Sequence, residues 1–167
     1  YGSFSDLEKI TSDTAAVVIE TIQGEAGIRV ACTAYFQALR ARCTETGTLL
    51  ILDEIQAGFG RTGTFWAFEQ FDIVPDILVC AKGMGGGMPI GAFIANKELM
   101  EVFKNNPLLG HITTFGGHPV SAAASLATLK VLQEENLIEQ VAEKASLFRS
   151  LLIHRQIKAI RNQGLMM

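Results

Sequence analysis

Three charged residues stand directly after short apolar runs of the sequence. Glu20 ends "AAVVIE", Asp53 follows "TLLIL" and Lys82 follows "DILVCA". Each run is too short for a helix and too uniformly apolar for a strand with one solvated face, a pattern typical of parallel strands covered on both faces. Because ligands bind beyond the carboxyl ends of such strands, we expect two acids and an amine around one crevice.

These groups suit the chemistry of pyridoxal phosphate. Burial in an apolar pocket disfavours the ammonium form of a lysine, and the neutral amine of Lys82 can form a Schiff base with an aldehyde. Asp53 can keep a pyridine nitrogen protonated, which makes the ring an electron sink. The glycines after Lys82 let the backbone approach a bulky cofactor or form a plain turn: Gly83, Gly85, Gly86 and Gly87.

Each of these residues also has an interpretation without chemistry. A strand-end Asp such as Asp53 is commonly a helix cap or loop anchor, and a lysine before glycines is commonly solvated. The combination of Asp53 and Lys82 favours a site over either residue alone.

The run "LLILDE" also fits a different class of enzyme. In a Walker B strand the Asp orders magnesium and the Glu activates water, so a P-loop ATPase is an alternative. That class requires G-x-x-x-x-G-K-[ST] after an earlier strand, and this sequence has no such run. The glycines after Lys82 do not fit the G-x-G-x-x-G of a dinucleotide site either, because Met88 stands at its last position.

The intervening segments predict an α/β fold, a mostly parallel sheet with flanking helices. "TAYFQALRARCTETG" predicts a crossover helix with Tyr35, Leu39 and Cys43 on one face and Gly47 as its stop. The second crossover, "FGRTGTFWAFEQFDIVPD", is rich in glycine and aromatic residues and predicts mostly loop. "AFIAN" predicts a fourth strand, reached too soon for a helical crossover and therefore expected to be antiparallel.

The last third of the chain predicts helices. "KELMEVFKN" and "SAAASLATLKVLQEEN" have helical composition, and "LIEQVAEKASLFRSLL" places five apolar side chains on one stripe: Leu137, Val141, Ala145, Phe148 and Leu152. The change from alternating strands and helices to consecutive helices predicts a domain boundary near Pro119.

Composition narrows the class of protein. The 167 residues are 49% hydrophobic and 19% charged, which suits one globular unit with a sizeable core. The net charge of −3 with scattered Lys and Arg indicates no nucleic-acid or membrane partner. Three cysteines, an odd number without C-x-x-C spacing, favour a reduced cytoplasmic compartment, and no ligand spacing supports a metal.

Four blocks follow one another along the chain: "VVIETIQGEAGI", "LLILDEIQAGFGRTG", "AKGMGGGMPIGAF" and "HITTFGGHPVSAAA". In order and spacing they resemble the class III aminotransferases, fold-type-I enzymes that include the ornithine, acetylornithine and 4-aminobutyrate aminotransferases. The resemblance implies a large pyridoxal-phosphate-binding domain in residues 1–118, and an interdomain helix and the start of a small C-terminal domain in residues 119–167. It also implies amino transfer from an ω-amino donor to a 2-oxo acid, for which 2-oxoglutarate is expected.

Carried over to this sequence, the resemblance makes Lys82 the Schiff-base lysine and proton carrier, and Asp53 the partner of the pyridine nitrogen. Gln56 matches a glutamine that hydrogen-bonds the phenolic oxygen of the ring. Thr114 matches a threonine that reaches the cofactor phosphate of the neighbouring subunit, which implies a homodimer with shared active sites. Glu25 matches a glutamate that pairs with a substrate-binding arginine in ornithine-type members. Taken alone, Gln56 is a plain loop amide and Thr114 a helix cap. The resemblance places Glu20 beneath the site as a structural acid.

Other parts of the family pattern have no counterpart in this sequence. The loop that cups the phosphate, the aromatic that stacks on the ring and the arginines that hold the substrate carboxylate are expected before Tyr1 or after Met167. We therefore predict weak cofactor binding by these 167 residues alone, and an exposed sheet edge that promotes association. A non-catalytic, aminotransferase-like scaffold is the remaining alternative.

Overall fold

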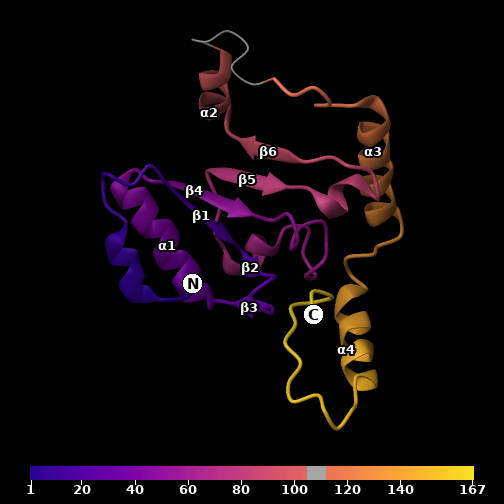
Figure 1. Cartoon of the computed structure of the whole chain (residues 1–167). Coiled ribbons are helices and arrows are strands. Elements are labelled where there is room, and N and C mark those ends of the chain that lie inside the picture. The colour runs from indigo at the N-terminus through magenta and orange to yellow at the C-terminus, as the bar shows by residue number, and fades with distance from the viewer. Residues whose placement is uncertain (105–111) are drawn as a thin grey trace.

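A mixed four-stranded sheet forms the centre of the computed structural model, which describes residues 1–104 and 112–167 (Figure 1). The strand order is β1-β4-β5-β6; β1, β4 and β5 are parallel, and β6 is antiparallel to β5. The strands span Ala16–Glu20 (β1), Leu49–Asp53 (β4), Ile77–Cys80 (β5) and Ala92–Ala95 (β6). The predicted α/β class, the three parallel strands and the antiparallel fourth strand are confirmed.

The sheet is well packed on one face and less so on the other, which corrects the expectation of two covered faces. Leu50 and Leu52 point to the packed face and are fully buried. Val18 points to the opposite face and keeps 69% of its surface exposed, while its register partner Ile51 is partly buried. A continuous apolar run indicates that both faces of a strand favour burial, but the segments that would bury them lie elsewhere in the fold.

Helix α1 (Thr33–Thr46) packs beside β4, where Figure 1 shows it along one side of the sheet. Four of its side chains are buried: the three predicted from their spacing, Tyr35, Leu39 and Cys43, and also Phe36. Phe36 also meets Phe71, with ring centroids 4.5 Å apart. Gly47 ends the helix in the left-handed conformation, φ 73°, as predicted.

The connection from β4 to β5 is mostly turns, as predicted, with the 3₁₀ helix η2 (Ala67–Phe71) inside it. Phe59, Phe65 and Trp66 pack together there with centroids 4.9–5.3 Å apart. Three short elements within residues 1–30 were not predicted because their local patterns are too brief: the 3₁₀ helix η1 and the strands of a small antiparallel hairpin. They span Phe4–Lys9 (η1), Ile22–Gln23 (β2) and Arg29–Val30 (β3).

A short helical segment follows β6, where the sequence predicts a helix over "KELMEVFKN". Helix α2 (Lys97–Glu101) continues into the 3₁₀ turn η4 (Val102–Lys104). Asn96 caps α2, because its Oδ1 accepts the N–H of Leu99 at 2.9 Å. The last residue of the predicted helix, Asn105, lies outside the described residues.

Helix α3 (Pro119–Glu134) packs against the 3₁₀ turn η3 (Lys82–Gly85), which follows β5. The contact explains one glycine of the run after Lys82. Gly86 has a left-handed φ of 56°, and a Cβ at this position would lie 2.0 Å from Thr128 Oγ1. At Gly86 the absence of a side chain therefore serves helix packing rather than the approach of a cofactor.

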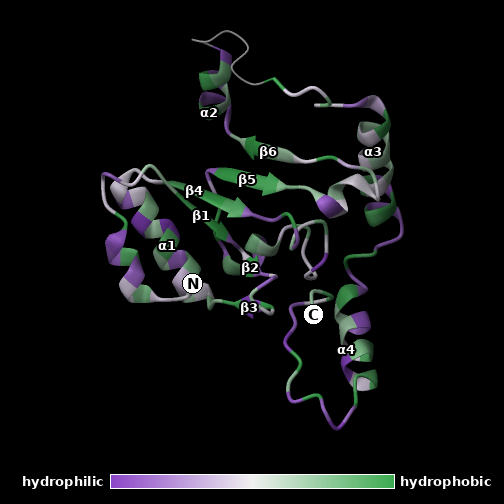
Figure 2. Ribbon diagram, in the orientation of Figure 1, coloured by the Kyte–Doolittle hydropathy of each residue, from purple (hydrophilic) through white to green (hydrophobic). Residues whose placement is uncertain are grey.

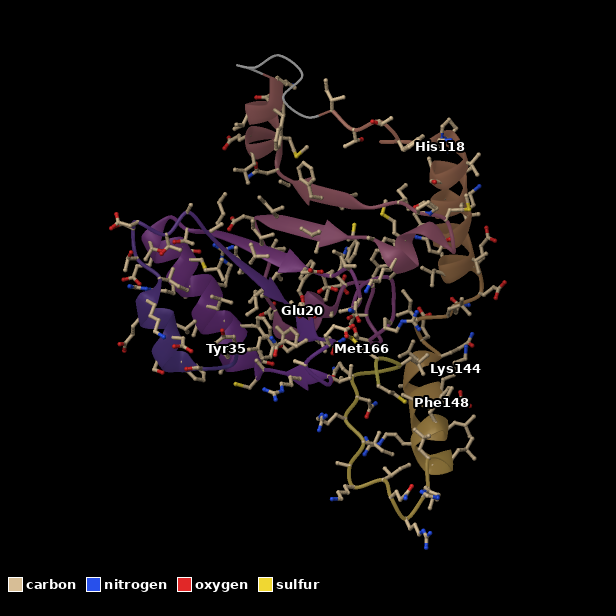
Figure 3. The ribbon with its side chains drawn as sticks, viewed as in Figure 1. Glu20, Tyr35, His118, Lys144, Phe148 and Met166 are labelled. Atoms are coloured by element: carbon tan, nitrogen blue, oxygen red, sulfur yellow. The ribbon has the colours of Figure 1, made fainter. Side chains whose placement is uncertain are left out.

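Helix α4 (Val141–Leu151) begins four residues later than the apolar stripe predicts. Val141 and Ala145 are buried, whereas Phe148 is 54% exposed, and Figure 3 shows its side chain on the outside of the helix. The alternating colours of α4 in Figure 2 show the amphipathic pattern behind this prediction. Phe148 lies in α4 as predicted but is exposed, and Leu152 lies just beyond the end of the helix, so burial of the stripe extends only to Ala145.

The C-terminal segment returns to the first half of the chain. Met166 is buried against three apolar side chains: Ile22, Ala57 and Ala67. The Leu165 N–H donates to the Arg61 carbonyl at 2.9 Å. Figure 3 shows Met166 close to the body of the molecule, at the end of the loop that follows α4. The domain boundary near Pro119 remains a prediction.

None of the helices among the described residues has both the length and the apolar content that a membrane span requires. Cys32 is exposed, Cys43 and Cys80 are buried, and all three thiols are free. Burial raises the pKa of the Cys43 and Cys80 thiols, which keeps both in the unreactive thiol form.

Candidate active site

The carboxyl ends of the parallel strands meet at one edge of the sheet, as the sequence predicts. Glu20 and Asp53 are register partners at the ends of β1 and β4, and Asp53 pairs with Val79 of β5, three residues before Lys82. Figure 3 shows Glu20 at the carboxyl end of β1, in the middle of the molecule. The sheet therefore brings the three predicted strand-end residues into one region.

Lys82 occupies a strained position immediately after β5. Its φ is +45°, a left-handed conformation that L-residues other than Asn and Asp rarely adopt and that collects at functional sites. Its side-chain amine has no hydrogen bond or ion pair within the described part of the chain. Lys82 lines a pocket of about 220 Å³ with Gln56, Phe59, Arg61 and neighbouring glycines. The expectation of an apolar, buried lysine is wrong for this chain, because Lys82 is exposed and shares its pocket with a second cation.

Asp53 ends β4 with one carboxyl oxygen engaged. Its Oδ1 accepts the N–H of Ile55 at 2.9 Å, and Oδ2 has no donor among residues 1–104 and 112–167. Asp53 lines a different pocket, of about 390 Å³, together with Tyr1 and Glu20. Burial raises the pKa of Tyr1 to about 12, and its hydroxyl donates to the Thr21 carbonyl at 2.8 Å. Asp53, the last residue of β4, and Lys82, two residues after β5, thus lie at the same end of neighbouring strands, and they line different pockets.

Glu20 holds the backbone that follows its own strand. Its Oε2 accepts the N–H of Gly24 at 2.9 Å, which ties β1 to the turn of the small hairpin. This contact is structural, in keeping with the role that the resemblance implies for Glu20.

Gln56 and Glu25 come together from segments 31 residues apart. The Gln56 amide Nε2 donates to Glu25 Oε1 at 3.4 Å, a long hydrogen bond. Gly24 makes this approach possible, because a Cβ there would lie 2.6 Å from Gln56 Oε1. Two of the residues that the resemblance singles out are therefore neighbours beside the Lys82 pocket.

Thr114 lies in the segment whose residues Thr113 and Gly116 line a third pocket together with Ile55 and Ala81. It is exposed in a turn of residues 114–117 that leads into α3, and it lines neither the Lys82 pocket nor the Asp53 pocket. His111, which opens its sequence block, lies outside the described residues. His118 directly precedes α3 and is exposed; Figure 3 shows it at the start of that helix.

Sequence reasoning did not single out Glu54 as a residue of the site. Glu54 is completely buried and accepts hydrogen bonds from Thr21 Oγ1 at 2.7 Å and from the N–H groups of Ala67 and Phe68, both at 2.9 Å. Desolvation raises its pKa, and these hydrogen bonds act in the opposite direction. The adjacent acids Asp53 and Glu54 could have indicated that they have different environments, because neighbouring residues at a strand end point to opposite faces of the sheet.

The buried position of Glu54 also removes the ATPase alternative. A Walker B glutamate must contact a water beside the nucleotide. Protein donors bind both Glu54 carboxyl oxygens, and its side chain has no exposed surface.

Residues 2–167 match the family described as Aminotransferase class-III. The chain belongs to the class III aminotransferases. This class III chain is 45% identical to the acetylornithine aminotransferase of Methanopyrus kandleri, over all of its own length and 43% of the relative's. It is 39% identical to a LysW-aminoadipate semialdehyde/glutamate semialdehyde transaminase of Sulfolobus acidocaldarius, over 99% of its own length and 43% of the relative's.

Solved structures of the family share the fold. The ornithine aminotransferase of Toxoplasma gondii superposes on this class III chain with a TM-score of 0.88 at 34% identity, over 99% of this chain and 40% of that one. That enzyme was found with pyridoxal phosphate at partial occupancy in its active site. The chain described here spans less than half the length of each of these relatives.

Proposed function

We propose that this chain carries the cofactor-anchoring part of a pyridoxal-phosphate-dependent aminotransferase. The observation that carries the proposal is the Lys82 amine, which has no partner among residues 1–104 and 112–167. It stands on a strained turn after β5, the strand next to the one that Asp53 ends, in a chain of the class III family. Strained backbone conformations persist where the surrounding structure holds them, and they cluster at functional sites. Here the strained residue, Lys82, lines a pocket.

The residues present fit pyridoxal phosphate. The Lys82 amine is available to attach the aldehyde covalently, and Asp53 Oδ2 is available to accept the N–H of a protonated pyridine ring. The Gln56 amide can donate to the phenolic oxygen of the ring. When bound, the cofactor supplies an electron sink for the carbon that loses its proton. Lys82 would carry that proton as a general base once the amino group of the donor has replaced its amine on the aldehyde carbon, which leaves the lysine amine free.

The substrates we propose are an ω-amino donor and a 2-oxo acid. The names of the relatives support a donor of the acetylornithine or ornithine type, and we assign 2-oxoglutarate as the acceptor. Glu25, beside Gln56, is proposed to pair with a substrate-binding arginine and so to influence which amino group of the donor reacts.

Assembly and location complete the proposal. Thr114, which is exposed and does not line the Lys82 pocket of its own chain, is proposed to reach the cofactor phosphate of a second subunit in a homodimer. The uncovered surface of Val18 supports further packing against this chain. Free cysteines are in keeping with a cytoplasmic protein.

A non-catalytic scaffold is the second candidate. It is favoured by the exposure of Lys82 and by the separate pockets of Lys82 and Asp53. A scaffold has no need of a covalent cofactor, so the two candidates differ in one measurable property.

Borohydride reduction followed by peptide mapping measures that property. The native-length protein, loaded with pyridoxal phosphate, should acquire a phosphopyridoxyl label on the peptide that contains Lys82. Lys82→Ala should lose the label, and Lys97→Ala, which changes another exposed lysine, should keep it. A label on another lysine, or none at all, would overturn the proposal. A panel of ornithine, acetylornithine and 4-aminobutyrate with 2-oxoglutarate then identifies the donor.

A further inference from the structure

Glu54 follows Asp53 directly, yet its carboxyl group lies inside the protein while Asp53 lines a pocket. Oε1 of Glu54 accepts from Thr21 Oγ1 and the Phe68 N–H, and Oε2 accepts from the Ala67 N–H. The Glu54 carboxyl group lines neither the Lys82 pocket nor the Asp53 pocket, and it forms no ion pair among the described residues. Burying such a group costs free energy. Its position beside Asp53 suggests what it is for.

The backbone of Glu54 is bound as firmly as its side chain. Its N–H donates to the Val79 carbonyl of β5 at 2.8 Å, and its carbonyl accepts the N–H of Gly58 at 2.9 Å. We call the five hydrogen bonds of Glu54 the Glu54 clamp. It joins the end of β4 to β5, to η2 and to Thr21, which directly follows β1. The turn of residues 54–58, which carries Gln56, therefore has no freedom to shift without breaking the clamp.

The chemistry of the clamp requires a carboxyl group. The two backbone donors, from Ala67 and Phe68, approach different oxygens, so a glutamine would place its NH₂ group against one of them. A neutral carboxylic acid can satisfy both by donating its own proton to Thr21 Oγ1. Burial raises the pKa of Glu54, so Thr21 is the group that allows the clamp to hold in either protonation state.

We propose that Glu54 is a positioning residue for the cofactor: it holds the 54–58 turn so that Asp53 and Gln56 meet the pyridoxal phosphate ring together. This inference rests on the proposed function. Asp53 is bonded within the same turn, through the Ile55 N–H, and Gln56 is pressed against Gly24. A displaced turn therefore moves both ring contacts at once, whereas the loss of Asp53 or Gln56 removes one.

The test compares Glu54→Gln with the wild type in the native-length protein, with pyridoxal phosphate as the probe. Affinity is measured by absorbance titration, and the absorption of the bound cofactor is followed against pH. We expect about tenfold weaker affinity, the effect of about one lost hydrogen bond. We also expect the pH midpoint of the bound cofactor to move by about half a unit or more, because its ring contacts have changed.

Control variants separate positioning from simple loss of stability. Glu69→Gln changes an exposed carboxylate of the same 3₁₀ helix, where Glu69 Oε1 accepts the Trp66 N–H at 3.3 Å. Leu39→Val weakens the core beneath α1. Both should keep the wild-type affinity and pH midpoint. Thr21→Ser keeps the hydroxyl donor and should match the wild type, whereas Thr21→Val should shift both readouts in the direction of Glu54→Gln.

The outcomes are distinct. If both Glu54→Gln and Thr21→Val behave as the wild type, the positioning role is refuted while the proposed function stands. If Leu39→Val shifts the cofactor absorption equally, the effect is general destabilisation and the positioning role is also refuted. If the wild type does not take up pyridoxal phosphate, the proposed function and this inference fall together. Should Glu54→Gln not fold, Thr21→Val and Thr21→Ser decide the question by themselves.

Discussion

Gly86 provides a quantitative test of how the Lys82 turn is seated on α3. An added Cβ would lie 2.0 Å from Thr128 Oγ1 and 3.4 Å from Thr128 Cβ. The hydroxyl is not free to rotate away, because it donates to the Ala124 carbonyl at 2.9 Å. Gly86→Ala must therefore strain its own left-handed backbone and also push η3 and α3 apart.

The two effects of Gly86→Ala have separable sizes. A left-handed φ costs a residue with a Cβ about 1–2 kcal/mol, and overpacking costs about 1–3 kcal/mol. The free energy of unfolding should therefore fall by about 2–5 kcal/mol. Thr128→Ala removes the clashing oxygen but leaves the backbone strain. In the double variant the overpacking cost of Gly86→Ala should disappear and only its backbone strain should remain. The coupling energy between the two substitutions should therefore be about 1–3 kcal/mol.

Urea denaturation of the wild type, both single variants and the double variant measures this cycle. The same proteins can be titrated with pyridoxal phosphate, because η3 begins at Lys82. A Gly86→Ala cost below about 0.5 kcal/mol, within the range of an ordinary surface change, would show that the turn is not seated on α3. Additive costs in the double variant would show that Thr128 is not the group that Gly86 must avoid.

Three further predictions concern stability. The free energy of unfolding should fall as pH rises from below 4.5, the ordinary pKa of a glutamate, through the raised pKa of Glu54. In this range the folded chain holds a proton that the unfolded chain has released. Glu54→Gln should lack this fall, and a variant with the same pH profile as the wild type would count against a titrating Glu54. Asp76→Ala should cost about 1–3 kcal/mol in urea denaturation, because Asp76 Oδ2 accepts the Leu50 N–H and pairs with Arg40 Nη1, both at 2.7 Å. Asp76→Asn keeps an acceptor for Leu50 but loses the charge beside Arg40, so its loss should be smaller; an equal loss in both would assign the cost to the ion pair and not to the Leu50 contact. Met166→Ala should cost about 2–5 kcal/mol and speed limited proteolysis of the C-terminal segment; Met167→Ala, at a more exposed position, is the matched control and should leave both unchanged.

Several features could be predicted because their cause lies in neighbouring residues. Helix α1 has its buried face in a four-residue repeat and its stop in Gly47. The parallel strands are continuous apolar runs, and β6 follows β5 too closely for a helical crossover. Since parallel strands end at one edge, the meeting of Glu20, Asp53 and the Lys82 turn could be inferred from order alone.

Other features could not be predicted because their cause lies far away in the chain. The burial of Glu54 depends on Thr21, 33 residues earlier, and on the N–H groups of η2. The apolar stripe of α4 predicts burial of Phe148, but nothing in the stripe shows where the chain goes next. The same limit applies to the exposed face of β1 at Val18.

The amino-acid sequence determined the strands, the order in which they end and the residue types at those ends, because short-range patterns of polarity specify these features. Tertiary structure alone decided which of two adjacent acids, Asp53 or Glu54, faces a pocket and which is buried as a clamp. It also decided that Gly86 serves the packing of α3. The physical reason is that hydrogen-bond donors and close neighbours from distant segments assign a side chain its role, and these meet only in the folded chain.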